Sequence, residues 1–262
     1  MPNLKAEVEI EELDEYLELQ IEQMEFRHEL QTIGLVPGTL VLDLQPASDL
    51  WVKSLSQLVG SDGKLVIASP NEGSMVAKYR NTSTLKTPLE KLSLDERIFD
   101  FSLARLVFSH LREPGKVLEE MVRVTKPGGK VVIADLDAGG FNHYPIPDYL
   151  EQQIRELFKE FHRLRIWDPH MGRKIFSLFQ EACLENVRVH VLPYHVVAGN
   201  PQRLDMSEWD ERISRLEQLV DLGLSRLSFD LKSFKHELHS FFQNPMRFSY
   251  TNMILVEGTR PQ

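Results

Sequence analysis

The sequence predicts an α/β fold with a doubly wound, mostly parallel sheet. Between residues 39 and 137, apolar runs of strand length alternate with segments of helical periodicity. Runs such as "LVLDL" and "KLVIAS" are almost continuously apolar, which is typical of parallel strands that helices cover on both faces. Turn sequences such as "GSDG" and "KPGG" separate these elements, and together the three observations favour the doubly wound class.

The elements are expected in a regular order along the chain. In residues 1–38, "LDEYLELQIEQM" has apolar residues at helical spacing and predicts an N-terminal helical cap. The remainder, 39–262, is expected to form one α/β domain with helical insertions near 141–170 and 205–243. The first insertion is rich in aromatic residues and is interpreted as a lid over the strand ends. Strands are predicted over 39–44, 64–69, 99–106 and 130–137, with helices over 48–59, 73–82 and 114–125 and a closing strand in "FSYTNMILVEGTRP".

Composition narrows the function classes. The 262 residues carry a formal net charge of -9, which disfavours a nucleic-acid partner because phosphate contacts need Lys and Arg. The single cysteine, Cys183, excludes an internal disulfide and fits a cytoplasmic protein. The acidic start "MPNLKAEVEIEELDEY" is unlike a secretory signal, and no apolar run is long enough to span a membrane.

Polar residues stand where the predicted strands end. Ligands of doubly wound folds bind at the carboxyl ends of the strands, so Asp43, Ser69 and Arg105 are candidate ligand contacts. His110 follows the third of these strands and is either a general base or a residue that only caps the backbone. Asp135 and Asp137 could orient an acceptor, bind a divalent cation or cap a loop; the spacing matches no metal motif, and no metal site is predicted.

The order of these motifs is familiar. The segment "FDFSLARLVFSHLREPGKVLEEMVRVTKPGGKVVIADLD" resembles the fourth strand, helix, turn and fifth strand of class I S-adenosylmethionine-dependent methyltransferases of the type-11, ubiquinone/menaquinone-biosynthesis-like group. "MGRKIFSLFQEACLENVRVHV" and "MILVEGTRP" resemble later elements of that family. The resemblance implies a Rossmann-like sheet of seven strands, S-adenosylmethionine as cofactor and a small, partly apolar molecule as substrate.

The resemblance also assigns the cofactor positions. The candidate cofactor contacts lie at three predicted strand ends and just before the strand over 99–106, and they are Asp43, Gln45, Ala47, Ser48, Ser69, Pro70, Pro88 and Arg105. His110 is the candidate catalytic base from its position. Several of these residues depart from the family pattern. Gln45 and Ala47 stand where glycines are usual, and Ser69 and Pro88 stand where acidic residues are usual.

Three functions therefore stay open. The chain is a methyltransferase for a small molecule; or it has lost the cofactor and is a binding or regulatory partner; or it is a repurposed cyclase or isomerase of secondary metabolism that needs no cofactor. Cofactor binding separates the first from the others. The N-terminal helices are expected to cover the pocket or to support a homodimer or another protein partner.

Overall fold

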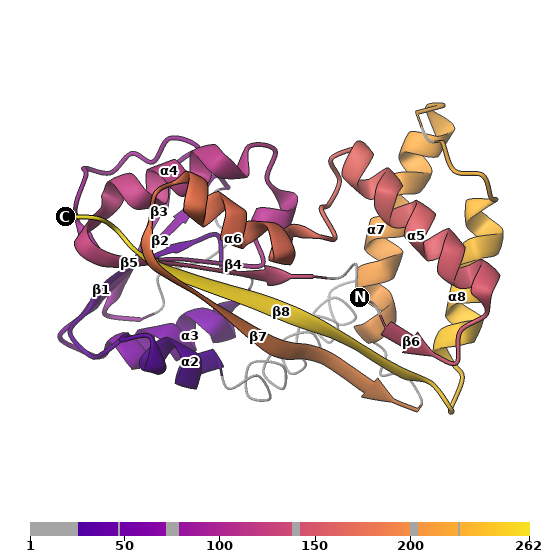
Figure 1. Cartoon of the computed structure of the whole chain (residues 1–262), viewed down its shortest axis with the longest axis horizontal. Helices are drawn as coiled ribbons and strands as arrows, with labels where there is room; N and C mark the ends of the chain where they lie inside the picture. The colour runs from indigo at the N-terminus through magenta and orange to yellow at the C-terminus, as the bar shows by residue number, and fades with distance from the viewer. Residues whose placement is uncertain (1–25, 47, 72–78, 138–141, 200–203, 225) are drawn as a thin grey trace, which may run out of the picture.

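The computed structural model describes residues 26–46, 48–71, 79–137, 142–199, 204–224 and 226–262. It has an eight-stranded mixed sheet with helices on both faces, and a second group of helices beyond one end of the sheet (Figure 1). The fold is doubly wound and Rossmann-like. No helix among the described residues is long and apolar enough to cross a membrane.

The parallel part of the sheet contains five strands. They are β1 (Leu40–Leu44), β2 (Lys64–Ser69), β3 (Thr82–Lys86), β4 (Phe99–Arg105) and β5 (Thr125–Leu136), in the spatial order β3-β2-β1-β4-β5. The order reverses between β1 and β4, so this position is the switch point at which doubly wound folds bind ligands. The carboxyl ends of β1, β2, β4 and β5 meet along one edge.

Strand β8 (Phe248–Thr259) joins the two parts of the molecule. On one side it pairs antiparallel with β5 and, further along, with the short β6 (Asn142–Tyr144). On the other side it pairs with β7 (Glu185–Ala198), starting from the pair Ala198 and Phe248. Just beyond that pair, the amide of Gly199 donates to the carbonyl of Arg247 at 2.7 Å, which closes the end of this long ribbon.

Helices cover both faces of the parallel strands. α2 (Phe26–Thr32) and α3 (Asp49–Val59) pack against one face, and buried Leu30, Trp51 and Leu55 belong to the same cluster as Val41 and Phe101. α4 (Pro114–Val124) and α6 (Met171–Glu181) cover the other face. Burial on both faces explains why the strands are apolar without alternation.

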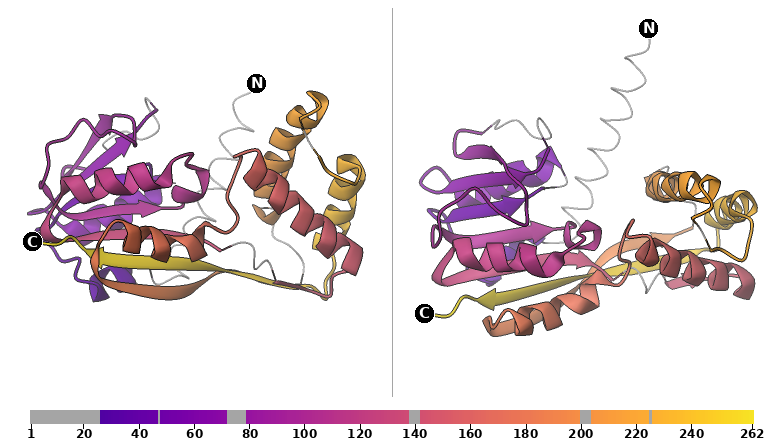
Figure 2. Two further views of the ribbon diagram at one scale, coloured as in Figure 1. Left: turned by 45° about the horizontal axis from the view of Figure 1, so that its top comes forward. Right: turned by 90° about the horizontal axis from the view of Figure 1, so that it is seen from above.

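We call the second group of helices the lid. It consists of α5 (Asp148–Arg163), α7 (Leu204–Asp221) and α8 (Leu231–Phe242), and Figure 2 shows these helices beyond the same end of the sheet in two further views. Aromatic rings fill its interior. The Phe158 ring lies 5.8 Å from that of Trp209 and 5.7 Å from that of Trp167 between centroids.

The structure confirms the predicted fold class and corrects some elements. Seven strands were expected and eight are present; β6, at the start of the first insertion, is outside the expected order. Strand β3 was not predicted, and Thr82, expected in a helix, begins it. The expected turn "KPGG" lies inside β5 as a bulge, with the register shifting opposite Phe99 and Phe101. The rest of the helix expected over 73–82 lies mainly outside the described residues, as do residues 1–25 of the N-terminal cap.

Candidate functional site

Four buried polar residues lie at the carboxyl edge of the sheet. Asp43 in β1 and Asp135 in β5 are fully buried, and Ser69 and Arg105 end β2 and β4. Because β2, β1, β4 and β5 are neighbours in this order, the fold brings residues from distant parts of the sequence to one edge. Charged side chains are rarely buried unless opposite charges or hydrogen bonds offset the loss of hydration. We therefore expect such partners around the charged residues of this cluster.

Asp43 is held by the helix that follows it. The indole Nε1 of Trp51, in the first turn of α3, donates to Asp43 Oδ2 at 2.8 Å. The other oxygen, Oδ1, has no hydrogen-bond partner among the described residues. Burial raises the pKa of Asp43 to about 7, although the Trp51 hydrogen bond and the charge of Arg105 both favour ionisation. The site therefore contains one oriented carboxyl oxygen with unused capacity to accept a hydrogen bond.

Arg105 lies inward from this edge and is only 2% exposed. Its guanidinium carbon is 5.3 Å from the centroid of the Trp51 ring, a cation–π arrangement. Burial lowers the pKa of Arg105, while Tyr194, Asp43 and Asp135 oppose that shift. The arginine thus compensates the two buried carboxyls.

Asp135 holds the loop after β4. Its Oδ2 accepts from the Ser109 amide at 2.9 Å, and its Oδ1 accepts from the Leu136 amide at 2.8 Å. Burial raises the pKa of Asp135 to about 6, against these hydrogen bonds. Asp137, two residues on, forms an ion pair with Arg173 at 2.9 Å. Asp135 therefore caps the loop after β4, and Asp137 links the end of β5 to α6.

The turn after β1 keeps a backbone shape that favours glycine. Gln45 has φ +45°, in the left-handed region, and its amide donates to the Ala68 carbonyl at 2.8 Å. A side chain in this conformation costs about 1–2 kcal/mol. Ser48 is the N-cap of α3, and its hydroxyl accepts from the Trp51 amide at 3.2 Å. Ala47 lies outside the described residues.

The remaining predicted positions lie around the same edge. Ser69 ends β2 and its Oγ accepts from the Asn71 amide at 3.2 Å, while Pro70 is exposed beside it. Pro88 is exposed just beyond β3, the strand that the sequence did not reveal. His110 ends the short 3-10 helix η1 (Phe108–His110) after β4, with an exposed side chain. The contact between Trp51 and Asp43 was not expected, although their spacing across the β1–α3 turn could have suggested it.

Comparisons with known proteins agree with this architecture. A family model described as a methyltransferase domain matches residues 42–133, from β1 to β5. UbiE, the ubiquinone/menaquinone biosynthesis C-methyltransferase of Hydrogenovibrio crunogenus, is 29% identical over 133 residues, which are 47% of this chain and 52% of that protein. The demethylmenaquinone methyltransferase of Bacillus mycoides is 22% identical over 188 residues, 64% of this chain and 79% of the relative. A crystal structure from Bacillus halodurans has a TM-score of 0.56 at 15% identity, over 90% of this chain and 98% of that one.

Residues 42–133 therefore match a methyltransferase domain, and the chain as a whole has the fold of solved methyltransferase-like structures. The chain spans about half the length of the UbiE relative, 52%. The likeness to the Bacillus halodurans structure extends through almost the whole chain and concerns the fold.

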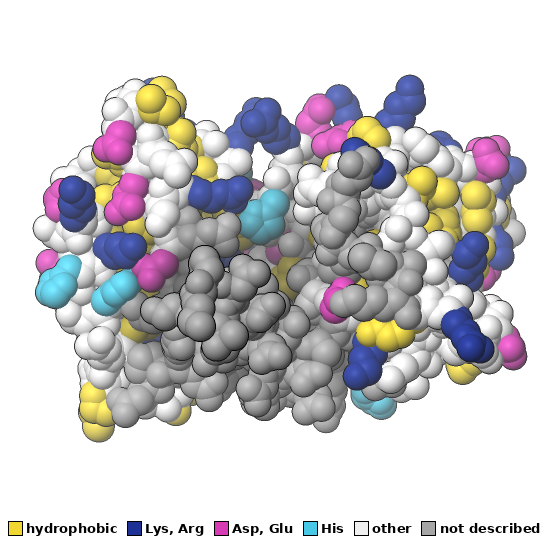
Figure 3. Space-filling view, turned by 180° about the vertical axis from the view of Figure 1, so that it is seen from behind, with side chains coloured by type: hydrophobic (Ala, Val, Ile, Leu, Met, Phe, Trp, Pro, Cys, Tyr) yellow, Lys and Arg dark blue, Asp and Glu magenta, His cyan; other side chains and the backbone are white. Residues whose placement is uncertain are grey.

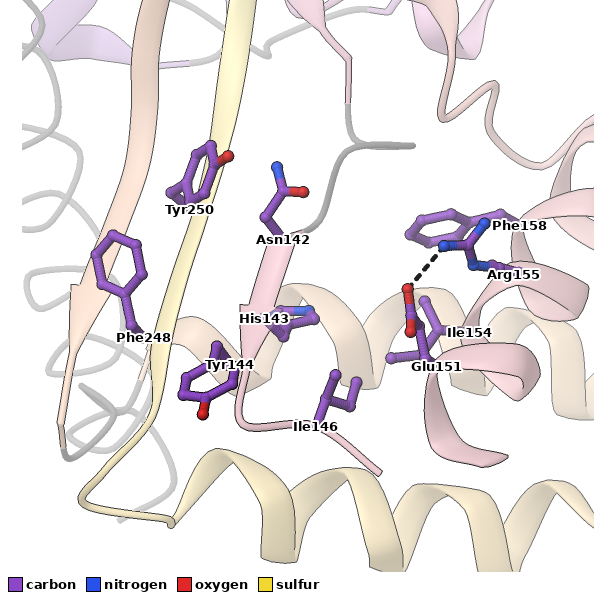
Figure 4. Close-up of a pocket in the computed structure, with 10 residues that line it drawn as sticks. All are labelled: Asn142, His143, Tyr144, Ile146, Glu151, Ile154, Arg155, Phe158, Phe248 and Tyr250. Atoms are coloured by element: carbon purple, nitrogen blue, oxygen red, sulfur yellow. Dashed lines mark hydrogen bonds and ion pairs between the residues drawn. The ribbon is translucent and has the colours of Figure 1, made fainter. Parts of the chain in front are cut away.

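The lid of this methyltransferase fold contains a cavity of about 200 Å³ (Figure 4). β6 and β8 line one side of it and α5 the other. Its lining includes aromatic and aliphatic side chains together with Asn142 and an ion pair of 2.7 Å between Arg155 and Glu151. The rings of Phe248 and Tyr250 lie 5.7 Å apart. The wall of this cavity therefore combines polar and apolar groups in similar measure.

Proposed function

We propose that this chain transfers a methyl group from S-adenosylmethionine to a small molecule that contains an aromatic ring. The observation that carries the proposal is the Asp43 carboxyl, which is buried at the end of β1, oriented by Trp51 and left with one oxygen unpaired. In the family that the sequence resembles, this position approaches the amino group of the cofactor.

The described residues fit the methionine end of the cofactor. Asp43 Oδ1 can accept a hydrogen bond from an ammonium group, and the positive charge would favour the ionised carboxyl, which burial disfavours. The left-handed backbone at Gln45 keeps the shape of a glycine turn. A solved relative of the fold, a Haemonchus contortus N-methyltransferase, was crystallised with S-adenosylhomocysteine, with a TM-score of 0.52 at 16% identity.

At the position expected to face the ribose of the cofactor, this chain has a weaker hydrogen-bond acceptor. Ser69 offers one hydroxyl where the family pattern has a carboxylate that accepts from both ribose hydroxyls. A hydrogen bond to a charged group contributes about 1.5–3 kcal/mol, so one such loss lowers affinity by roughly tenfold to a hundredfold. We therefore expect binding that is measurable but weaker than in relatives with the acidic residue.

In this proposal, the residues of the chain position the cofactor and the acceptor relative to each other. When bound, S-adenosylmethionine supplies an electrophilic methyl group. Asp43 binds and orients the amino group of the cofactor, the lid excludes water, and the cavity between α5 and β8 holds an aromatic acceptor against Phe158 and Tyr250. His110, at the carboxyl end of β4, takes the acceptor proton in this scheme.

Calorimetric titration tests the proposal. Wild-type protein is titrated with S-adenosylmethionine and S-adenosylhomocysteine beside Asp43→Asn and a matched control, Asp62→Asn, in an exposed turn. We expect Asp43→Asn to weaken binding at least tenfold and Asp62→Asn to leave it within twofold. No heat from wild type at about 5 mM ligand, or equal effects of both variants, contradicts the proposal.

A second function has an observation in its favour. Ser69 and the exposed Gln45 replace the residues that most favour the cofactor in the family pattern. This favours a protein that keeps the lid cavity for ligand binding without methyl transfer. Binding of an aromatic probe such as 1-naphthol by a protein that does not bind S-adenosylmethionine is the result that supports it.

A further inference from the structure

We propose that a second cavity, between η1, the end of α5 and the start of α6, binds a phosphate group of a small phosphorylated molecule. The cavity has a volume of about 330 Å³, at the lower end of the range for small-molecule sites. It shares no lining residue with the lid cavity of Figure 4. Its charged lining residues are Arg112, His162, Arg165, Asp168 and Lys174.

The charges of these side chains do not balance. The Lys174 ammonium forms an ion pair with the Asp168 carboxylate, which also lies 3.4 Å from His162 Nδ1. Arg112 and Arg165 line the same cavity, and neither guanidinium has a hydrogen bond or ion pair with the residues that the structure describes. After the one carboxylate is matched, two guanidinium charges remain.

This excess contrasts with the rest of the protein. The chain as a whole carries a formal charge of -9, and basic and acidic side chains are interspersed on the face shown in Figure 3. Two forked guanidinium groups suit an oxyanion with several acceptor oxygens and two negative charges, which is the chemistry of a phosphate monoester.

The start of α6 adds to the positive potential. Its first residue, Met171, and Lys174 in its first turn both line the cavity. This turn contains no acidic residue, and the N-cap, His170, forms no capping hydrogen bond through its side chain. The amides of His170 and Met171 already donate to the carboxylate and carbonyl of Asp168, so this helix of 11 residues favours an anion through its dipole.

Arg165 occupies a backbone position that suits glycine better. It follows α5 with φ +55°, at a helix end where glycine or asparagine is usual. The left-handed conformation costs about 1–2 kcal/mol for a side chain with a Cβ. The cavity gives this side chain a use that glycine could not fulfil.

The wall of the cavity rests on the sheet edge. Trp167 is 3% exposed and Ser109 is 4% exposed, and both line the cavity. The Asp168 amide donates to the Ser109 carbonyl at 2.7 Å, which ties the α5–α6 connection to η1. A phosphorylated molecule bound here would therefore lie beside the loop after β4 rather than among the aromatic rings of the lid.

The test is titration with inorganic phosphate in a buffer of low ionic strength. Wild-type protein is compared with Arg112→Gln/Arg165→Gln, with Arg112→Gln alone, and with Arg188→Gln, which removes a charge from an exposed position on β7. Circular dichroism checks that each variant is folded. We expect at least tenfold weaker phosphate binding in the double variant and at least threefold weaker binding in Arg112→Gln, with Arg188→Gln within twofold of wild type.

Two outcomes overturn the proposal. One is no detectable heat from wild-type protein at about 50 mM phosphate. The other is an equal loss in Arg188→Gln and in the cavity variants, which would mean that phosphate responds only to overall charge. If the double variant is unfolded, Arg112→Gln decides the question, and unchanged phosphate binding in this variant rejects the site. S-adenosylmethionine binding is measured in parallel, so that this result is independent of the methyl-transfer proposal.

Discussion

Replacing Asp43 by asparagine should remove much of the pH dependence of stability in this protein. The asparagine side chain has the same shape and an oxygen that can still accept from Trp51 Nε1, so the variant removes the titration and keeps the hydrogen bond. In the wild type, burial raises the pKa of Asp43 from 3.8 to about 7. The folded protein therefore holds a proton at pH values where the unfolded chain has released it.

The direction and the size of this pH effect on stability follow from the difference in proton binding between the folded and unfolded states. A folded-state pKa above the unfolded one stabilises the folded protein fully below pH 3.8, and this stabilisation is lost as the pH rises through about 7. Each pH unit inside that interval changes the free energy of unfolding by up to about 1.4 kcal/mol. Integrated between pH 5 and pH 7, the loss from this one group is about 2 kcal/mol.

Urea unfolding followed by tryptophan fluorescence measures the effect. The difference in unfolding free energy between wild type and Asp43→Asn should change by about 2 kcal/mol between pH 5 and pH 7, with wild type gaining relative stability at acid pH. Asp62→Asn, in an exposed turn, is the control and should follow wild type. A difference that varies by less than about 0.5 kcal/mol over this interval would refute the reasoning, since Asp43 would then titrate alike in both states.

Three further predictions follow from contacts described above. Trp51→Phe removes the donor to the buried Asp43 carboxyl and should lower the free energy of unfolding by about 1–3 kcal/mol, more at pH 8 than at pH 5, as urea titration at both pH values will show. If His110 is the base, His110→Gln should lower kcat by about 10² to 10⁴ and leave KM within threefold in a steady-state assay; an unchanged kcat rejects that role. In Gly172→Ala, the new methyl group would lie 2.9–3.0 Å from atoms of β8 and the end of β5, so stability should fall by about 1–3 kcal/mol. Gly115→Ala, with nothing within 4 Å, is its control, and equal effects of the two would contradict this account.

The central strands could be predicted because burial on both faces gives them a continuous apolar sequence. "LVLDL" and "KLVIAS" lie between two layers of helices, so nearly every position is apolar, and their observed bounds agree with the predicted ones within a residue. Strand β3 has the sequence "TSTLK" and lies at the edge of the sheet, where most of its side chains are partly exposed or exposed. Such a strand carries no apolar run, and its position was therefore missed.

The sequence allowed single residues of the candidate site to be predicted, but it did not allow the contacts between them to be predicted. Asp43 was identified because it lies within the first strand, next to the end where ligands bind in this fold. The burial of Arg105 depends on Trp51, Asp43 and Asp135, which come from three other elements, so no local pattern could reveal it. The lid cavity likewise combines α5 with residues of β8 almost 100 positions away, and only the three-dimensional fold unites them.

The closed end of the β7–β8 ribbon determines where this fold can vary in sequence and length. Ala198 pairs with Phe248, and the next hydrogen bond joins Gly199 to Arg247, so the chain leaves and re-enters the sheet at adjacent points. Everything between them, including α7 and α8, is an insertion at the tip of a hairpin. Its length and sequence can therefore drift, be exchanged or be grafted from another member without shifting the register of the strands that carry Asp43, Arg105 and Asp135. The cavity between α5 and β8 has no lining residue from the described part of this insertion, so such changes would alter how the lid packs and leave the cavity lining and the buried cluster at the sheet edge in place.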